Sequence, residues 1–240
     1  MKTKLLLICS VLFIQALAFA QPATNVSTLP YYDNFAYTLG QSLIGQGNWT
    51  NATTSTVDDI IVAGLTSPSG LQAATGNAVN ISGGNSDPIK YFTEQTSGTV
   101  YYSFLVKINP GSGTNNFYDT FPTATPGQFI SLGQQSNTTP ANTNYGACVF
   151  SRMTAAGNIN FGLVLDSNVG NVVWDTTTIV VGTTYMVVVS NTFDSSTPTA
   201  KLWINPVING TEPASLLTTS TGTNRTNLDR VYIRQDTNAK

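Results

Sequence analysis

Short runs of β-branched and aromatic residues recur along this chain, and clusters of turn-forming residues close them. The longest run spans residues 99–108, alternates its side chains between two faces, and stops at the breaker Asn109-Pro110-Gly111. No segment after residue 20 shows the 3.6-residue periodicity of an amphipathic helix. Regular strands separated by turns at this spacing predict an all-β fold, built as an antiparallel sandwich.

The expected strands can be placed by their β-branched composition and the turns between them. Val187-Val188-Val189 is apolar on both faces of its strand, which predicts a central position in a sheet. Neither an internal repeat nor an interdomain linker interrupts the pattern. The sequence predicts strands at residues 60–65, 99–108, 128–132, 147–153, 159–165, 171–174, 185–192, 200–204 and 228–234.

The first twenty residues have the three parts of a secretory signal peptide. Lys2 and Lys4 form the positive region, residues 5–18 form the apolar run, and Ala18-Phe19-Ala20 forms the small-x-small cleavage site. The apolar run is too short for a membrane span. We therefore expect cleavage before Gln21 and a protein that is secreted, extracellular or on the cell surface, without membrane insertion after cleavage.

Charged residues are few, and the net charge of the chain is slightly negative. The chain has 10 basic and 12 acidic residues, and only 9% of its residues are charged. Cleavage before Gln21 removes two lysines and moves the net charge from −2 to −4. Because no basic patch can form at this composition, nucleic acid is not an expected partner.

The rest of the chain is long enough for one domain with a sizeable core. We expect a flexible lead-in at residues 21–29 and a single domain at residues 30–240. Cys148 is alone once Cys9 leaves with the signal peptide, so no intrachain disulfide is expected. Its apolar neighbours predict a buried, inert thiol.

Four segments of the chain, taken in the order in which they occur, resemble segments of one protein family. The chain is similar to secreted proteins of Bacteroidetes-type bacteria that carry a concanavalin A-like lectin/glucanase (LamG-like) jelly roll. The resemblance covers about residues 31–234, and it implies a jelly-roll β-sandwich and, for many such proteins, export by type IX secretion. The segments are residues 32–49 (YDNFAYTLGQSLIGQGNW), 98–106 (GTVYYSFLV), 160–163 (NFGL) and 201–213 (KLWINPVINGTEP).

The resemblance also implies strands that close the jelly roll. Relatives of this kind continue after a segment like residues 228–235 into a further strand, which pairs beside the first strand. We therefore expect the first strand near residues 32–37, an unpaired edge on it, and a longer natural chain that supplies the last strand and any sorting domain.

Catalytic patterns are weak in this sequence. Histidine is absent, which removes Ser-His and Cys-His nucleophile pairs and histidine metal sites. Jelly-roll glucanases place alternating carboxylates on one strand, whereas Asp58 and Asp59 are adjacent and would point to opposite faces. Glu94 and Glu212 are the only glutamates, and only folding could bring them together.

Calcium is the one cofactor that the resemblance suggests, because it is common in LamG-like domains and prefers oxygen ligands. Asp33 and Asn34 are the best candidate ligands, although a turn-stabilising role explains the same two residues. No complete calcium-loop motif is present.

Sugar binding needs exposed aromatic rings beside amide and hydroxyl groups. The loop at residues 115–121 supplies Asn116, Tyr118 and Phe121, and Tyr145 and Trp174 are further candidates. The loop's aromatics could equally pack it onto the sandwich. Two other tryptophans, Trp49 and Trp203, lie in strand-like context and are expected in the core.

These features favour a non-catalytic, lectin-like module that binds an extracellular or cell-surface polysaccharide or mediates adhesion. A polysaccharide-active enzyme of the same fold, either a glycoside hydrolase or a lyase, is the alternative from a different class. A spacer domain without a ligand is the third hypothesis, because this fold serves many functions.

Overall fold

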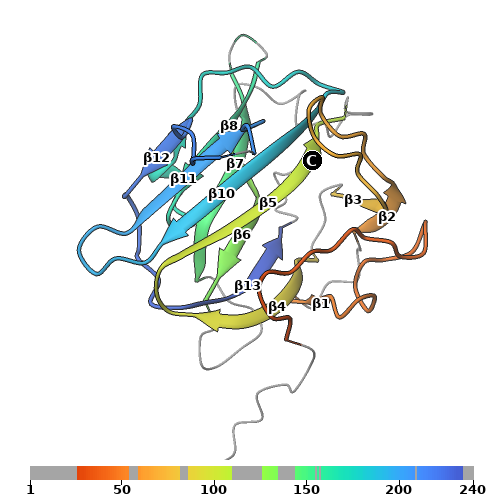
Figure 1. Ribbon diagram of the computed structural model, residues 1–240, viewed down its shortest axis with the longest axis horizontal. Coiled ribbons are helices and arrows are strands. Elements are labelled where there is room, and N and C mark those ends of the chain that lie inside the picture. The colour runs from red at the N-terminus through yellow and green to blue at the C-terminus, as the bar shows by residue number, and fades with distance from the viewer. Residues whose placement is uncertain are drawn as a thin grey trace, which may run out of the picture.

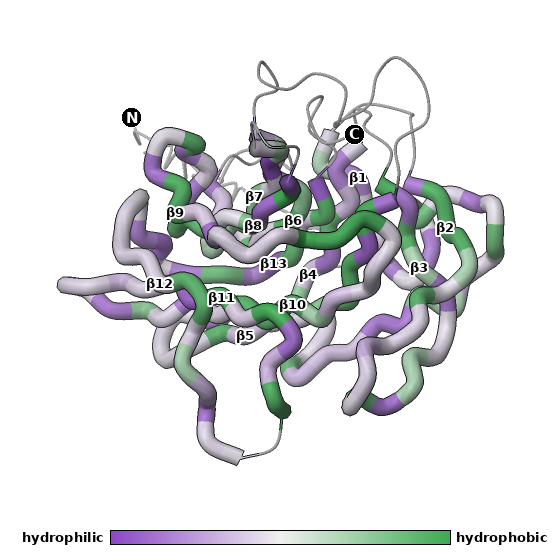
Figure 2. The backbone as a smooth tube through the Cα atoms, turned by 90° about the horizontal axis from the view of Figure 1, so that it is seen from above, coloured by the Kyte–Doolittle hydropathy of each residue, from purple (hydrophilic) through white to green (hydrophobic). Residues whose placement is uncertain are grey.

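The computed structural model describes residues 26–53, 59–81, 86–109, 126–134, 144–154, 156, 158–208 and 210–234. These residues form antiparallel β-sheets with one short 3-10 helix, η1 (Val169–Asn171), which confirms the predicted all-β class. Two sheets face each other as layers, and a two-stranded sheet lies beside them (Figures 1 and 2). The predicted signal peptide and the loop at residues 115–121 are outside the described residues.

The larger sheet has seven strands within the described residues. The last of them in sequence, β13, pairs with β4 on one side and with β6 on the other. In spatial order the strands are β1 (Thr50–Asn51), β4 (Pro88–Gln95), β13 (Leu228–Ile233), β6 (Gly127–Gly133), β7 (Tyr145–Met153), β8 (Ile159–Val164) and β9 (Val173–Trp174).

The smaller sheet has four described strands in the order β12 (Leu217–Thr219), β11 (Thr199–Ile204), β10 (Thr184–Thr192) and β5 (Thr99–Lys107). Strand β10 lies between β11 and β5, as the apolar run at residues 187–189 predicted. The two-stranded sheet consists of β2 (Ile60–Ala63) and β3 (Asn77–Asn80).

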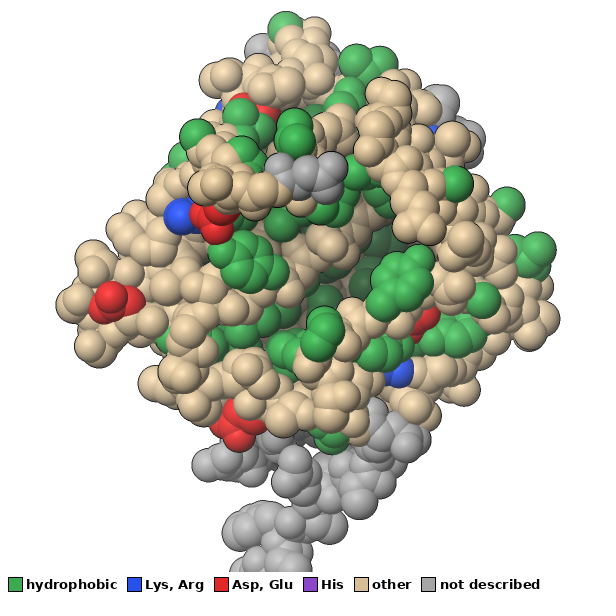
Figure 3. Space-filling model, in the orientation of Figure 1, with side chains coloured by type: hydrophobic (Ala, Val, Ile, Leu, Met, Phe, Trp, Pro, Cys, Tyr) green, Lys and Arg blue, Asp and Glu red, His purple; other side chains and the backbone are tan. Residues whose placement is uncertain are grey.

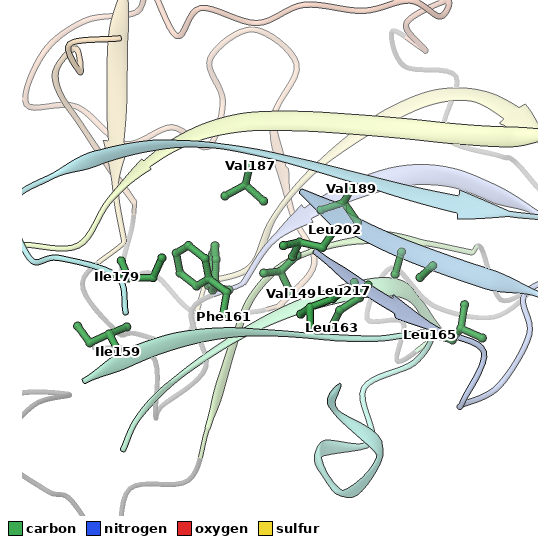
Figure 4. Packing of buried hydrophobic residues seen from close by; sticks show 13 residues of the cluster. Val149, Ile159, Phe161, Leu163, Leu165, Ile179, Val187, Val189, Leu202 and Leu217 are labelled. Atoms are coloured by element: carbon green, nitrogen blue, oxygen red, sulfur yellow. The ribbon is translucent and has the colours of Figure 1, made fainter. Parts of the chain in front are cut away.

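The main core fills the space between the two layers (Figure 4). Phe161, Leu163 and Val149 come from the seven-stranded sheet, and Val187 and Leu202 come from the four-stranded sheet. All of these side chains have no exposed surface. Because side chains alternate along a strand, residues next to these in sequence lie on the two outer faces of the sandwich.

Most strands that the sequence predicted are present with shifts of one or two residues at their ends. The exceptions are residues 171–174, of which only Val173–Trp174 is strand, and four strands that were not predicted, β1, β3, β4 and β12. The most important of these is β4, because it holds β13 in the sheet. Its sequence, PIKYFTEQ, begins with proline and carries Lys90 at a buried position.

The predicted first strand at residues 32–37 is wrong, because this stretch has no strand structure. Its side chains instead hold an irregular N-terminal segment (residues 31–49) against β2, β3 and β13 through a cluster around Leu43, Trp49 and Ile61. The unpaired strand edge expected at residues 32–37 is therefore absent. Within the expected lead-in, Ser27 pairs with Phe92 of β4 through hydrogen bonds to Tyr91 and Thr93.

Candidate functional site

The outer face of the four-stranded sheet carries an exposed aromatic side chain. Val100, Ala200 and Leu202 point into the core. The alternating residues Tyr101, Lys201 and Trp203 therefore point outward. Tyr101 and Lys201 lie in one row, because each is paired with Ser190 of β10 from opposite sides. Strand pairing therefore gathers residues one hundred positions apart in sequence.

Hydrogen bonds fix these side chains to a carboxylate from the loop after β11. The Tyr101 hydroxyl donates to Glu212 Oε2 at 2.6 Å, and Lys201 Nζ donates to Glu212 Oε1 at 2.9 Å. The Tyr101 and Trp203 rings lie 6.4 Å apart between centroids with 32° between their planes. Lys201 Nζ lies 5.9 Å from the centroid of the Trp203 ring. We refer to Tyr101, Lys201, Trp203 and Glu212 as the Tyr101 cluster.

The ionisation states within the Tyr101 cluster follow from these bonds. Hydrogen bonds from Tyr101 and Lys201 lower the pKa of the Glu212 carboxyl below its ordinary value. The hydrogen bond to Glu212, together with burial, raises the pKa of the Tyr101 hydroxyl. At neutral pH the cluster therefore holds one carboxylate, one ammonium and one protonated phenol, with no net charge.

Tyr101 is one of the exposed rings among the described residues, with Tyr31 and Tyr32. Tyr101 is 53% exposed, whereas Trp203 beneath the same cluster is 4% exposed. Figure 3 shows hydrophobic side chains gathered on this side of the molecule, around a hollow beside β5 that faces the two-stranded sheet. A solvent-exposed ring beside fixed donors and acceptors provides both contact area and hydrogen-bonding specificity for a ligand.

A cavity of about 280 Å³ adjoins the Tyr101 cluster. Trp203 lines the cavity, and its indole N–H donates to the Pro213 carbonyl at 2.9 Å, which ties the loop after β11 to the sheet. The remaining lining residues are Ile204, Pro206, Pro213, Ala214, Ser215 and Leu216.

Two of the candidate sugar-binding residues, Tyr145 and Trp174, lie together on the outer face of the seven-stranded sheet. Neither presents a free ring. Tyr145 is 6% exposed, its ring is 5.0 Å from that of Tyr232, and the guanidinium of Arg234 lies 5.0 Å from its centroid. Tyr145 is therefore part of the core on that face.

Trp174 lies flat against the sheet because Gly162 beneath it has no side chain. A Cβ at Gly162 would approach Trp174 Cε3 to 2.6 Å. The guanidinium of Arg152 stacks on the ring at 4.2 Å from its centroid. The contacts with Gly162 and Arg152 occupy the ring, so this tryptophan does not offer an open platform. Asn116, Tyr118 and Phe121 are outside the described residues.

Asp33, the candidate calcium ligand, serves as the hydrogen-bond acceptor at the centre of the N-terminal segment. Its Oδ2 atom accepts bonds from Tyr31 Oη (2.9 Å), Tyr37 Oη (2.7 Å) and Trp49 Nε1 (2.9 Å). Its Oδ1 atom accepts the backbone N–H of Phe35 at 2.8 Å, which forms an Asx turn. A cation at this carboxylate would have to displace these donors.

Asn34 has a similar structural role. Its Oδ1 atom accepts the N–H of Ala36 at 3.2 Å, and its backbone carbonyl accepts the N–H of Asn77 at 2.9 Å. Among the described residues, no three or more cysteine, aspartate or glutamate side chains gather in a group that could hold a metal ion. The geometry thus supports the turn-stabilising alternative for this pair.

The two tyrosines on Asp33 predict a loss of stability in alkali. Burial and the hydrogen bond to Asp33 raise the pKa of Tyr31 to about 12 and raise the pKa of Tyr37 further. The folded protein therefore holds these protons more tightly than the unfolded chain. Their contribution should be complete below about pH 10 and should decline as the pH rises towards about 12.

This decline can be measured as the slope of the free energy of unfolding against pH in that range. The Tyr31→Phe/Tyr37→Phe variant should show a shallower slope than the parent protein, whereas Tyr32→Phe, at an exposed ring in the same segment, should keep it. An unchanged slope in the double variant would contradict the assignment.

Three other expectations concerned buried residues. Cys148 has no exposed surface, and burial raises the pKa of its thiol well above the ordinary value. Trp49 and Trp203 are both 4% exposed, as predicted for core residues. Trp203, however, is buried beneath the loop after β11, on the outer face of its sheet, and not between the two layers.

Sequence reasoning missed the Tyr101 cluster. The alternation within residues 99–108 does place Tyr101 on the face opposite Val100 and Tyr102, so the orientation of the ring was readable. The contact between Tyr101 and Glu212 could not be predicted from the sequence, because it depends on how the loop after β11 folds back over the sheet. Glu94, the second glutamate, accepts a hydrogen bond from Asn227.

Comparison with models of protein families gives no match to this chain, and comparison with curated proteins gives none. Within the described residues, no helix has the length and apolar character needed to cross a membrane.

Proposed function

We propose that this protein is a secreted or cell-surface, non-catalytic lectin-like module that binds carbohydrate through the Tyr101 cluster. We also propose that its sandwich is a jelly roll of the concanavalin A-like type. The antiparallel two-layer architecture supports the second proposal, and the resemblance in residues 31–234 supports both. Fold alone does not select a ligand, so the functional proposal depends on the surface chemistry.

The observation that carries the proposal is the exposed ring of Tyr101 beside a fixed ion pair. A pyranose has an apolar C–H face that packs on an aromatic ring, and it has hydroxyl groups at its edge. The ring of Tyr101 offers the first contact, and Glu212 and Lys201 offer an acceptor and a donor for the second. Because these side chains already hold one another, little side-chain entropy is lost on binding.

The state of Glu212 argues against a role as the proton donor of a glycosidase. A glycosidase acid needs a raised pKa so that it is protonated near neutral pH. The pKa of Glu212 is lowered by Tyr101 and Lys201, which keeps the carboxylate charged. Such a group accepts hydrogen bonds from sugar hydroxyls but is poorly suited to donate a proton to a leaving group.

A glycan array followed by calorimetric titration tests the proposal. Tyr101→Ala should weaken binding of any positive glycan about tenfold to a hundredfold, since buried aromatic contacts contribute about 1–3 kcal/mol. Tyr32→Ala removes a ring that is 74% exposed elsewhere and should leave the affinity unchanged. The melting temperature of both variants should stay near that of the parent, because both rings are exposed.

Three outcomes would contradict the proposal. An array without any positive glycan would favour a spacer domain. Equal affinity in Tyr101→Ala and the parent would place the site elsewhere. Release of reducing or unsaturated sugar ends from a polysaccharide, lost in Glu212→Gln, would favour an enzyme.

A further inference from the structure

We propose that the cavity beside the Tyr101 cluster accepts the methyl group of a neutral 6-deoxy sugar. This inference rests on the proposed carbohydrate-binding function and names the class of sugar that the site prefers. It depends on three features of the structure: the shared boundary between cavity and cluster, the chemistry of the lining, and the charge of the rim.

The cavity and the Tyr101 cluster share Trp203. The indole lies beside Tyr101 and Lys201, and the same residue lines the cavity. The loop makes a second connection, because Glu212 in the cluster directly precedes Pro213 in the lining. A sugar ring held by Tyr101 and Glu212 therefore has the cavity within reach of its substituents.

The lining side chains are mostly apolar, and the polar group of each of the two others already has a partner. Ile204, Pro206, Pro213, Ala214 and Leu216 are apolar. The two polar members are already engaged. The Trp203 indole N–H donates to the Pro213 carbonyl, and the Ser215 hydroxyl lies 2.6 Å from that of Thr218.

This lining discriminates between a methyl and a hydroxymethyl group. A buried hydroxyl without a partner costs free energy, whereas a buried methyl group gains it. The cavity is open to solvent on the side of Pro213, Ala214 and Leu216, so the exocyclic CH2OH of an ordinary hexose would lose part of its hydrogen bonding to water on entering it. The CH3 of a 6-deoxyhexose would not, and a volume of about 280 Å³ is ample for it.

The rim of the site favours a neutral ligand. The charges of Lys201 and Glu212 offset each other at 2.9 Å. A uronic acid or a sulfated sugar would bring a negative charge next to the Glu212 carboxylate, and its attraction to Lys201 would compete with the existing ion pair. Neutral hydroxyl groups can instead bond to both side chains while the pair stays intact.

Titration with matched sugars tests the inference on the secreted protein. The probes are the methyl glycosides of D-glucose, D-galactose and D-mannose and the methyl glycosides of their 6-deoxy counterparts. We expect at least one 6-deoxy sugar to bind about tenfold more tightly than its parent hexose, which corresponds to about 1.4 kcal/mol. Equal or weaker binding of all three 6-deoxy sugars would overturn the inference.

Two variants connect the preference to the cavity. Ala214→Phe, at an exposed position of the loop, should fill the cavity and remove the difference in affinity between a 6-deoxy sugar and its parent hexose. Leu216→Asn should reduce the preference by adding a polar partner for a hydroxymethyl group. A preference that survives both changes would overturn the inference.

The outcomes separate the inference from the proposed function. If hexoses and 6-deoxyhexoses bind equally and Tyr101→Ala abolishes both, the carbohydrate-binding function stands and the cavity is not the specificity pocket. If the glycan array is negative as well as the titrations, both proposals fail together.

Discussion

Asp33→Ala should lower the free energy of unfolding by about 3 kcal/mol. The variant leaves Tyr31, Tyr37 and Trp49 without the carboxylate oxygen that accepts their three hydrogen bonds. Hydrogen bonds to a charged acceptor are worth more than neutral ones, and a buried donor left unsatisfied costs about 1–3 kcal/mol. Of the three donors, the indole N–H of Trp49 should cost the most free energy when it loses its acceptor, because that side chain is 4% exposed.

Urea unfolding of the parent and the variant gives the measurement. Asp194→Ala is the matched control, because Asp194 also accepts several bonds through one carboxylate, from Ser196 and Thr197, but in an exposed turn. The control should lose clearly less stability than Asp33→Ala. Similar losses in the two variants would show that the Asp33 interactions only order a local turn.

Adding or removing calcium distinguishes the role of Asp33 as a hydrogen-bond acceptor from a role as a metal ligand. If Asp33 only accepts hydrogen bonds, calcium or a chelator should leave the melting temperature of the parent unchanged. Lys90 points to the same conclusion, because its buried ammonium donates to the Gly47 carbonyl and lies 5.1 Å from the Tyr31 ring. Burial lowers the pKa of Lys90, and the Asp33 carboxylate opposes that shift. A cation beside Asp33 would be repelled by this ammonium.

The strands that could be predicted from the sequence are those whose pattern is local. Strand β5 alternates its side chains between two faces over nine residues, and strand β10 contains three consecutive valines, and these features do not depend on the rest of the chain. Strand β4 has no such pattern. Its Lys90 is buried only because the N-terminal segment covers that end of the sheet and provides a carbonyl partner.

The aromatic run at residues 32–37 was misread for the complementary reason. Tyr37 and Phe35 have strand-like composition, but their rings serve tertiary contacts with Asp33 and Trp49. A positive backbone φ of 50° at Phe35 bends the chain out of extended geometry. The composition of residues 32–37 favours a strand, but the hydrogen bonds to the Asp33 carboxylate stabilise the irregular conformation instead.

The candidate site shows the same division between local and long-range information. The outward orientation of Tyr101 follows from alternation within a single strand. The partner Glu212 is held in a loop by Trp203 and Pro213, so its position depends on packing that no local pattern encodes. For Tyr145 and Trp174 the sequence indicated aromatic rings, but the arginines that stack on them come from other parts of the chain, Arg234 from just after β13 and Arg152 from β7.

Asp229→Ala should lower the free energy of unfolding by about 3–5 kcal/mol, because it leaves a buried guanidinium without its counter-charge. Arg230 is 1% exposed, and its Nε and Nη2 atoms donate to the two oxygens of Asp229 at 2.6 and 2.9 Å. In the parent protein burial opposes the charge of Arg230, and hydrogen bonding to Asp229 raises its pKa above the ordinary value. Without Asp229 the guanidinium still keeps its proton at neutral pH, because arginine does not deprotonate in proteins, so the variant holds a buried, unpaired charge.

The double variant Asp229→Ala/Arg230→Met decides whether the loss comes from the unpaired charge. Methionine can occupy much of the space beside Tyr91 and Tyr232 without carrying a charge, so the double variant should regain more than half of the stability that Asp229→Ala loses. Urea unfolding of the single and double variants measures the difference. If Asp229→Ala costs less than about 1 kcal/mol, water must reach Arg230, and the outer face of the seven-stranded sheet is more open than its burial indicates.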